Sequence, residues 1–574
     1  MCLVKFIDEE IEIEVDKGST LVECIRKACL KIETPCTGKG NCGKCKVEAY
    51  GILSDKTKEE KELTQDDFIR LACMAKVEGD VQIKLIKKSS ILKTINNGIS
   101  IDTKLNSSIK KVELPSIISK NYMPYGKTID YKVDNLSILK KISQAEQNKY
   151  EMIYGVVFKQ TILNISPKSE KILGVAVDIG TTGISTYLID LEKGQVLNKV
   201  SALNPQTEYG NDVLSRITFS MKQDGGIDIL SKCIRDKINS MITQLVEDKF
   251  FSGDIYRVII AANTTMLHLF LGVKPDSIAI APYRAVFLDE INIKANELDI
   301  KINDEGILTL IPSVSSYVGA DIVAGIVATD FQNKNHSCVF IDIGTNGEIV
   351  AISDGKMAAS STAAGPAFEG MNISCGMRAE QGAIEGFDID NDFNVNYSTI
   401  GGGEPTGICG SGLLDIVASL VKTKVVLSSG RFNKELAIQL KDRLKDKKFY
   451  LTKNIYISQK DIRQVQLAKG AISSGIIMLL KQIGIDIKDI EEVVVAGAFG
   501  YHINPDSIKT IGLIPKGFIG DINFVGNSSI EGARIALINE DKLEEMSVIK
   551  QTIKIVELST REDFQDYFIR SLNF

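Results

Sequence analysis

Hydrophobic and polar residues alternate near the start of the chain. The alternation over Leu3–Ile7 and Glu10–Val15 surrounds an acidic turn and predicts a β-hairpin. Gly18-Ser19-Thr20 offers a helix N-cap before an apolar-periodic stretch at Leu21–Lys31. A late alternating strand follows at Val81–Leu85. Hairpin, helix, loop and late strand in this order predict a small β-grasp domain at the N-terminus, ending near residue 87.

The pattern changes twice beyond this domain. Residues 88–117 are rich in Lys, Ser, Asn and Ile and predict a linker. Residues 118–168 predict a small middle domain with a helix at Leu136–Asn148 and a strand at Tyr154–Leu163. After it, apolar strands alternate with glycine turns and helical patterns, which is typical of an α/β domain. We therefore expect an α/β multidomain protein whose last domain covers residues 169–574.

One motif occurs twice in this last domain. Gly174-Val-Ala-Val-Asp178-Ile-Gly-Thr-Thr-Gly183 resembles Cys338-Val-Phe-Ile-Asp342-Ile-Gly-Thr-Asn-Gly347. Each copy joins an apolar strand that ends in Asp to a glycine-threonine turn, and such a turn presents N–H groups and a hydroxyl to phosphate. An Asp at the end of a strand can hold Mg²⁺, directly or through water. The repeat predicts two halves, at residues 169–335 and 336–574, that grip one nucleotide from both sides.

A third glycine-rich turn fits the same site. Glu492–Ala496 is predicted to be a buried strand, and a turn from Gly497 to Gly500 follows it. Glycines at this place let a flat adenine ring lie against the backbone. Alone the pattern would indicate a simple strand–helix turn, but behind two phosphate loops it favours an adenosine site. The three histidines form no ligand pattern, and no hydrolase motif is visible.

Composition narrows the class of protein. The 574 residues are 44% hydrophobic and 25% charged, which is ordinary for a globular chain, and the net charge of −6 argues against a nucleic-acid binder. No run of 18 apolar residues predicts a membrane span, and the acidic N-terminal stretch argues against a secretory signal. We therefore expect a cytoplasmic protein. Seven of the 11 cysteines fall in the first 73 residues, which in a reducing compartment indicates metal or redox chemistry.

Four of these cysteines have the spacing of an iron–sulfur site, C-x5-C-x2-C-x27-C. They are Cys36, Cys42, Cys45 and Cys73. Plant-type [2Fe–2S] ferredoxins use C-x4-C-x2-C and a distant fourth cysteine, so the first loop here is one residue longer. Glycines in that loop let the backbone wrap closely and aim N–H groups at sulfur. The alternative is a zinc knuckle, but zinc sites usually pair two C-x2-C units, and no histidine lies near Cys73. The remaining cysteines are predicted to be buried small hydrophobes.

The loops at Asp178, Asp342 and Gly497 resemble the phosphate-1, phosphate-2 and adenosine motifs of the acetate and sugar kinase, Hsp70 and actin superfamily. With a [2Fe–2S] ferredoxin-like domain in front, the chain is similar to the ATP-dependent reductive activators of corrinoid (vitamin B12) proteins. Further family-like stretches lie at 204–213, 263–268 and 366–371. The resemblance is weakest over residues 90–168.

This resemblance implies a repair function. Corrinoid methyltransferases cycle through Co(I), which occasionally oxidises to inactive Co(II), and the family uses ATP to reduce it again. A plant-type cluster has a reduction potential of about −400 mV, and the potential of the Co(II)/Co(I) couple is generally lower. ATP would therefore favour a state of the complex in which electron transfer to cobalt is less unfavourable. The chain lacks the D-x-H-x-x-G motif of cobalamin carriers, so we expect the corrinoid on a partner protein. An upstream low-potential electron donor is implied, and a homodimer would fit the family; nucleic acid and membranes are not expected as partners.

The resemblance also implies residue roles. The four cysteines would hold the cluster, and Asp178 and Asp342 would position Mg²⁺. Glu348 is a candidate for orienting the attacking water. The predicted nucleotide-binding residues are Gly180, Thr181, Thr182, Gly344, Thr345, Asn346, Gly347, Gly497 and Gly500.

Three other functions stay open. One is an ATP-driven electron donor to another low-potential metalloenzyme, like the activators of 2-hydroxyacyl-CoA dehydratases; those are expected to hold a [4Fe–4S] cluster between two subunits, which the cysteine spacing speaks against. Another is a redox-sensing nucleotide-binding protein that does not turn over ATP. A small-molecule kinase is the third, and it leaves the ferredoxin-like domain unexplained.

Overall fold

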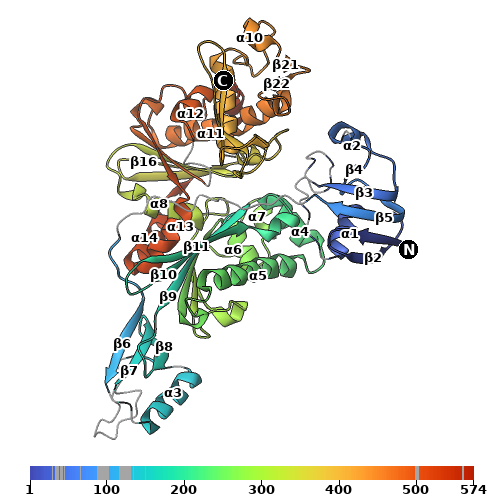
Figure 1. Ribbon diagram of the computed structural model, residues 1–574. Helices are drawn as coiled ribbons and strands as arrows, with labels where there is room; N and C mark the ends of the chain where they lie inside the picture. The colour runs from blue at the N-terminus through green and yellow to red at the C-terminus, as the bar shows by residue number, and fades with distance from the viewer. Residues whose placement is uncertain are drawn as a thin grey trace. The chain divides into compact units, whose positions relative to one another are not determined.

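A computed structural model gives the fold of the chain (Figure 1). The residues that it describes are 1–28, 30, 32, 38, 40, 43, 45–64, 66–86, 103–115, 131–133, 135–148, 150, 152–497, 503–558 and 561–574. The chain divides into two compact units, which are residues 1–91 with 203–230, and residues 92–202 with 231–574.

The first unit contains a five-stranded mixed sheet in the order β2-β1-β5-β3-β4. Its elements are β1 (Cys2–Phe6), β2 (Ile11–Val15), α1 (Leu21–Lys27), β3 (Lys46–Leu53), α2 (Lys58–Leu63), β4 (Ile69–Leu71) and β5 (Val77–Leu85). β1 pairs antiparallel with β2 and parallel with β5, which confirms the predicted hairpin and the β-grasp order. Thr20 caps α1 in a capping box with Glu23, as the sequence predicts, and the helix ends at Lys27.

Residues 203–230 of the same unit form η2 (Pro205–Glu208), α4 (Val213–Lys222) and the first turn of α5 (Gly226–Val246). Arg216 is fully buried here, and it donates to Gly210 O at 2.9 Å and to Gln206 Oε1 at 3.2 Å. A buried guanidinium that is hydrogen-bonded on two sides fixes the family-like stretch at 204–213.

The second unit begins with a small sheet in the order β6-β7-β8. Its elements are β6 (Ile109–Pro115), α3 (Leu136–Gln147), β7 (Met152–Phe158) and β8 (Thr161–Ser166). β6 falls inside the predicted linker, so the described middle domain begins earlier than residue 118. The single strand predicted at Tyr154–Leu163 is wrong, because the chain reverses there between β7 and β8. Lys159 turns it with a φ of 53°, a conformation that Gly or Asn usually signals in a sequence.

Two larger sheets with the same strand plan make up the rest of the second unit. The first has the order β11-β10-β9-β12-β14-β13 and the second β25-β24-β15-β16-β17-β26. In each, three consecutive antiparallel strands are followed by two parallel ones, which confirms the predicted duplication. The strands are β9 (Leu173–Ile179), β10 (Gly183–Asp190), β11 (Val196–Leu203), β12 (Ile255–Ala262), β13 (Ile291–Lys294), β14 (Ile307–Leu310), β15 (Cys338–Ile343), β16 (Gly347–Ser353), β17 (Lys356–Thr362), β24 (Glu492–Ala496), β25 (Asp521–Gly526) and β26 (Lys554–Ile555).

Two helices, α8 (Ala320–Ala328) and α13 (Ser528–Ile538), pack against each other beside these sheets (Figure 1). α13 also contacts β9, β10 and β12 of the first sheet, and it is followed by α14 (Glu540–Thr552). Close approach explains Gly532, because a Cβ there would lie 2.1 Å from the Ala324 carbonyl oxygen.

Further helices and strands belong to the second unit. Its further helices are α6 (Thr264–Leu271), α7 (Asp276–Ala279), α9 (Gly410–Lys422), α10 (Ile438–Lys441), α11 (Gln459–Ile483), α12 (Pro505–Ile511) and α15 (Phe564–Arg570). Its further strands are β18 (Ala383–Ile389), β19 (Val395–Thr399), β20 (Gly407–Ile408), β21 (Leu444–Lys445), β22 (Lys448–Tyr450) and β23 (Tyr456–Ser458).

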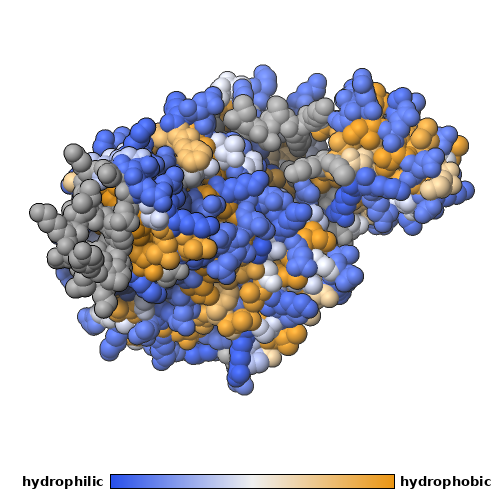
Figure 2. Space-filling view, turned by 90° about the horizontal axis from the view of Figure 1, so that it is seen from below, coloured by the Kyte–Doolittle hydropathy of each residue, from blue (hydrophilic) through white to orange (hydrophobic). Residues whose placement is uncertain are grey.

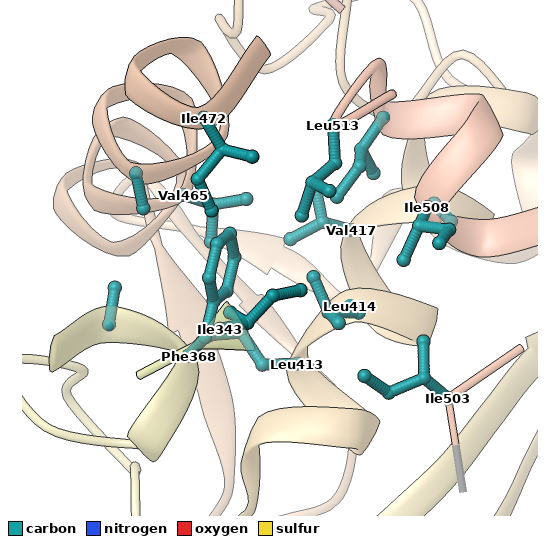
Figure 3. Close-up of a cluster of buried hydrophobic side chains, with 14 of the residues drawn as sticks. Ile343, Phe368, Leu413, Leu414, Val417, Val465, Ile472, Ile503, Ile508 and Leu513 are labelled. Carbon is teal, nitrogen blue, oxygen red and sulfur yellow. The ribbon is translucent and has the colours of Figure 1, made fainter. Parts of the chain in front are cut away.

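The hydrophobic core of the second half fixes two polar residues at its edge. Figure 3 shows Ile343, Phe368 and Val465 in this core, and all three are buried. Ile343 directly follows Asp342, and Phe368 directly precedes Glu369 in the 3-10 turn η6 (Pro366–Glu369). Because a packed core holds its side chains in fixed positions, the two neighbouring carboxylates are held as well.

The surface is mostly hydrophilic on the face in Figure 2, with smaller hydrophobic patches between the polar side chains. Among the residues that the structure describes, no helix combines the length and the apolar character needed to cross a membrane.

Candidate nucleotide site and cluster site

The two predicted phosphate loops lie next to each other in the second unit and share one carboxylate. Thr182 Oγ1 donates to Glu369 Oε2, and Thr345 Oγ1 donates to Glu369 Oε1, both at 2.7 Å. Asn263 Nδ2 also donates to Thr181 Oγ1 at 3.2 Å. A hydroxyl has one proton to donate, and Thr182 and Thr345 each donate theirs to Glu369, so the carboxylate competes with a phosphate for these two donors.

Asp178 and Asp342 occupy the corresponding place near the ends of β9 and β15. Asp178 is 8% exposed, and its two oxygens accept from Asn527 Nδ2 and Ser529 Oγ, each at 2.8 Å. Glu348 lies directly across from Asp342 on β16 and accepts from Ser361 Oγ at 3.3 Å. Since cross-strand partners share a face of the sheet, these two carboxylates are close neighbours.

A fourth carboxylate, Asp321 in the first turn of α8, joins this group. Desolvation, followed by the charges of Asp342 and Asp178, raises the pKa of Asp321 to about 8. Desolvation and the Asp178 charge raise the pKa of Asp342 to about 7. Desolvation and the Asp321 and Asp342 charges hold the pKa of Glu348 well above its ordinary value. Crowded like charges of this kind are what a bound divalent cation would relieve.

These carboxylates do not form a ready-made metal cage. Among the described residues, the one group of at least three His, Cys, Asp or Glu ligand atoms within 4.8 Å of one another is His336, Cys338 and Glu492. That group lies at the starts of β15 and β24, whereas Asp342 lies near the other end of β15. Lys334 already pairs with Glu492 there at 2.8 Å. A site near the phosphate loops with only a few protein ligands fits Mg²⁺. This ion usually keeps several waters and takes further ligands from phosphates.

The predicted glycines have different tasks. Gly497 has a φ of +124°, and a Cβ there would lie 2.5 Å from the Ile343 carbonyl oxygen, so the turn after β24 passes close to the second phosphate loop. A Cβ on Gly180 would lie 2.8 Å from Gly183 O, which reflects a tight first loop. The Gly344 N–H donates to Asn346 O at 2.9 Å, within the second loop. Gly347 starts β16, where Thr362 Oγ1 donates to its carbonyl at 3.1 Å, and Gly500 lies outside the described residues.

Affinity for Mg²⁺–nucleotide is expected to rise with pH. The raised pKa values of Asp342, about 7, and Asp321, about 8, mean that both carboxyls hold protons at mildly acidic pH, whereas a divalent cation would bind only their deprotonated forms. Each proton released on binding changes the affinity by up to about tenfold per pH unit. Calorimetry between about pH 6 and 9, with nucleotide lacking Mg²⁺ as the control, measures this; an affinity that does not change with pH contradicts it.

The same raised values predict how stability depends on pH without nucleotide. The unfolded chain loses these protons near the ordinary carboxyl pKa, while the folded chain keeps them until about pH 7 to 8. The free energy of unfolding of the nucleotide-free second unit should therefore fall as pH rises from the ordinary carboxyl pKa to about pH 8. Added Mg²⁺–nucleotide should restore it.

The cluster site is described for two of its four predicted ligands. Cys45 is 1% exposed, and its Sγ lies 3.3 Å from Cys73 Sγ, much longer than a disulfide bond of about 2.05 Å. The surrounding glycines take positive φ values of 84° at Gly38, 68° at Gly40 and 66° at Gly43. Two adjacent sulfur atoms beside a backbone that only glycine adopts easily fit a metal cluster. Cys36 and Cys42 lie outside the described residues.

Family models match three consecutive parts of the chain. Residues 5–78 match the 2Fe-2S iron-sulfur cluster binding domain, residues 173–334 match the RACo middle region, and residues 336–574 match the C-terminal domain of RACo, the ASKHA domain. These matches define an iron–sulfur protein with an actin-like ATPase fold. They confirm the predicted fold class and favour the [2Fe–2S] cluster over the zinc alternative.

Two relatives and one solved structure match most or all of the chain. The chain is 31% identical to the corrinoid activation enzyme RamQ of Eubacterium limosum, with 98% of both chains covered. It is 27% identical to the Co(II) methylated amine-specific corrinoid protein reductase of Methanosarcina barkeri, over 70% of this chain and 77% of that one. A solved structure of a reductive activator for corrinoid,iron-sulfur protein matches with a TM-score of 0.75 and 31% identity, covering 100% of this chain and 98% of that chain. The chain belongs to the RACo family of reductive activators of corrinoid proteins.

Proposed function

We propose that this chain uses ATP to drive the one-electron reduction of Co(II) to Co(I) on a separate corrinoid protein, and so returns a corrinoid methyltransferase system to activity. The observation that carries the proposal is a pair of phosphate loops joined through Glu369, in a chain whose N-terminal domain binds a [2Fe–2S] cluster. The relatives named for corrinoid activation and Co(II) corrinoid protein reduction support it.

The chain's own residues divide the work. When bound, the cluster supplies one electron at low potential and the nucleotide supplies the free energy of hydrolysis. Cys45 and Cys73, with Cys36 and Cys42, would hold the cluster. Asp178 and Asp342 would hold Mg²⁺, because the charge of Asp178 raises the pKa of Asp342 and a cation would offset that repulsion. The loop residues bind the phosphates, and the turn at Gly497 and Gly500 accommodates adenosine.

Glu348 keeps its proposed role in orienting the attacking water, with a condition. Desolvation, and then the charges of Asp321 and Asp342, hold the pKa of this carboxyl well above its ordinary value and favour its protonated form. A neighbouring Mg²⁺ would lower that pKa. Glu348 would therefore be a better hydrogen-bond acceptor for orienting the attacking water once Mg²⁺–nucleotide has bound.

ATP turnover tests the proposal against its rivals. Purified protein with intact cluster should hydrolyse ATP faster when a Co(II) corrinoid protein is present, because the nucleotide cycle is tied to the partner. Hydrolysis that responds only to a different low-potential metalloenzyme would support the dehydratase-type donor instead. No hydrolysis with any partner, together with nucleotide binding, would support the redox sensor.

Glu369→Gln is expected to tighten nucleotide binding by about tenfold. The carboxylate competes with phosphate for the hydroxyl protons of Thr182 and Thr345, and it repels the triphosphate; an amide has one acceptor oxygen and no charge. Titration of a fluorescent ATP analogue measures the affinity. Asp392→Asn, which removes an exposed charge elsewhere in the second unit, is the matched control. Weaker binding in Glu369→Gln would mean that this carboxylate contacts bound Mg²⁺ instead.

The proposal has several further parts. They are Mg²⁺ as the metal, an upstream low-potential electron donor, a homodimer and a cytoplasmic location. The location agrees with the reducing conditions that a low-potential cluster needs.

A further inference from the structure

We propose that α13 couples the nucleotide site to residues 104–108, the segment through which the chain enters the middle domain after the ferredoxin-like domain. Nucleotide binding beside Asp178 would change how firmly this segment is held. The inference rests on the proposed function, because it gives ATP a route to the part of the chain that connects to the electron carrier.

The N-terminal end of α13 is bonded to the first phosphate loop. Asn527 uses both ends of its amide: the oxygen accepts from the Ile530 N–H at 3.1 Å and caps the helix, while the nitrogen donates to Asp178 at 2.8 Å. Ser529, in the first turn, donates to the other Asp178 oxygen at 2.8 Å. Asn527 and Ser529 are therefore positioning residues, and any shift of Asp178 reaches the helix through both of them.

The body of α13 is held by close packing and by a buried ion pair. It packs on α8, the helix that carries Asp321, and Gly532 lets the two backbones touch. Glu531 and Arg534 form a buried ion pair of 2.7 Å on α13. The helix has 11 residues, so it spans roughly 16 Å from the nucleotide site to its far end.

The C-terminal end of α13 is capped by the entering segment. The last carbonyls of a helix have no partner within it, and here two of them accept from outside. Ile538 O accepts from the Asn106 N–H at 2.8 Å, and Leu537 O accepts from Ser107 Oγ at 3.4 Å. In return the Asn106 carbonyl accepts from the Glu540 N–H at 2.9 Å.

Side chains strengthen this contact. Asn106 Nδ2 donates to both Asp541 oxygens at 3.1 Å, and Asn539 Nδ2 donates to Lys104 O at 2.9 Å. Glu540, the first residue of α14, pairs with fully buried Arg257 at 2.8 Å, and Arg257 also donates to Ser108. Breaking the contact would leave a buried charge with fewer partners, so the segment has a defined held state.

Charge supplies the driving force. Asp178 acts electrostatically on both Asp321 and Asp342, and its own two oxygens accept from the two α13 donors. A cation and a triphosphate arriving at this point change the charge that Asn527 and Ser529 contact. Since α13 is closely packed and hydrogen-bonded at both ends, we expect the change to alter the contact with residues 104–108.

Hydrogen–deuterium exchange on the full-length protein with its cluster tests the coupling. The probes are the backbone amides of Asn106 and Glu540, measured anaerobically with and without Mg²⁺ and a non-hydrolysable ATP analogue. We expect saturating nucleotide to change their exchange rate by about five- to a hundredfold, the range of ordinary allosteric coupling. Ser529→Ala should remove most of this change. Ser528→Ala is the matched control, because the buried Ser528 Oγ has no hydrogen-bond partner in the described part of the chain.

Unchanged exchange at both amides in the wild-type protein, with the site saturated, overturns the coupling and leaves the proposed function standing if Co(I) still forms. Equal effects of Ser528→Ala and Ser529→Ala also overturn it. An analogue that does not bind overturns both.

As a functional check, Asn106→Ala should slow ATP-dependent cobalt reduction by about tenfold, while nucleotide binding and cluster reduction stay as in the wild type. Asn394→Ala is the matched control, because it removes an exposed Asn–Asp bond in the β18–β19 turn, and it should not slow the reaction.

Discussion

Asp178→Ala is expected to lower ATP-dependent Co(II) reduction by about a hundredfold or more, the loss typical of removing a group that stabilises transition-state charge. The variant removes a proposed Mg²⁺ ligand and the acceptor of both α13 donors. The cluster lies in the other compact unit, so its visible absorbance should be unchanged. The measurement is the initial rate of Co(I) formation at saturating ATP, with the cluster spectrum recorded on the same sample.

Asp392→Asn controls for the loss of an aspartate charge in the second unit, and it should keep the wild-type rate. Loss of the cluster spectrum in Asp178→Ala would contradict the separation of nucleotide and cluster into two modules. A wild-type rate in this variant would contradict the assignment of Asp178 to the nucleotide site.

Cys45→Ser is expected to lose the cluster and keep nucleotide binding, the reverse of Asp178→Ala. It removes a buried sulfur beside Cys73, so the [2Fe–2S] absorbance should be lost and Co(I) formation should fall to the background rate. Nucleotide affinity should stay within about twofold of the wild-type value, since the phosphate loops belong to the other unit. Visible absorbance, iron content and nucleotide titration measure the three quantities.

Cys2→Ala is the matched control within the same domain. Cys2 is buried at the start of β1 in the hydrophobic core and has no proposed ligand role, so iron content should not change. A cluster that survives Cys45→Ser while Cys2→Ala loses it would contradict the ligand assignment.

The sequence predicts the parts of this protein that depend on local pattern. The repeat of a strand followed by Asp-Ile-Gly-Thr identifies Asp178 and Asp342, because a buried strand and a tight turn each depend on consecutive residues. The cysteine spacing marks the cluster for the same reason. The single strand predicted at 154–163 is wrong because the chain reverses direction at Lys159, which is in a left-handed conformation. The sequence has no Gly or Asn at this position to indicate a turn.

Other site residues depend on distant packing and were missed. Asp321 stands in the otherwise apolar helix Ala320–Ala328, and a lone acid there was the available signal. Glu369 lies in a family-like stretch, yet its bonds to Thr182 and Thr345 exist only after two sheets have folded. Asn527 and Ser529 reach Asp178 across about 350 residues of chain, and such a contact leaves no local pattern.

The central claim is that ATP binding in one unit enables electron transfer from the cluster in the other to cobalt. The most direct test is anaerobic: the purified protein is mixed with a Co(II) corrinoid protein and a low-potential reductant, and Co(I) absorbance is followed with and without ATP. We predict Co(I) only with ATP, and none in Cys45→Ser. Equal Co(I) formation with and without ATP, or no Co(I) with several corrinoid partners while the cluster is reduced, would contradict the account.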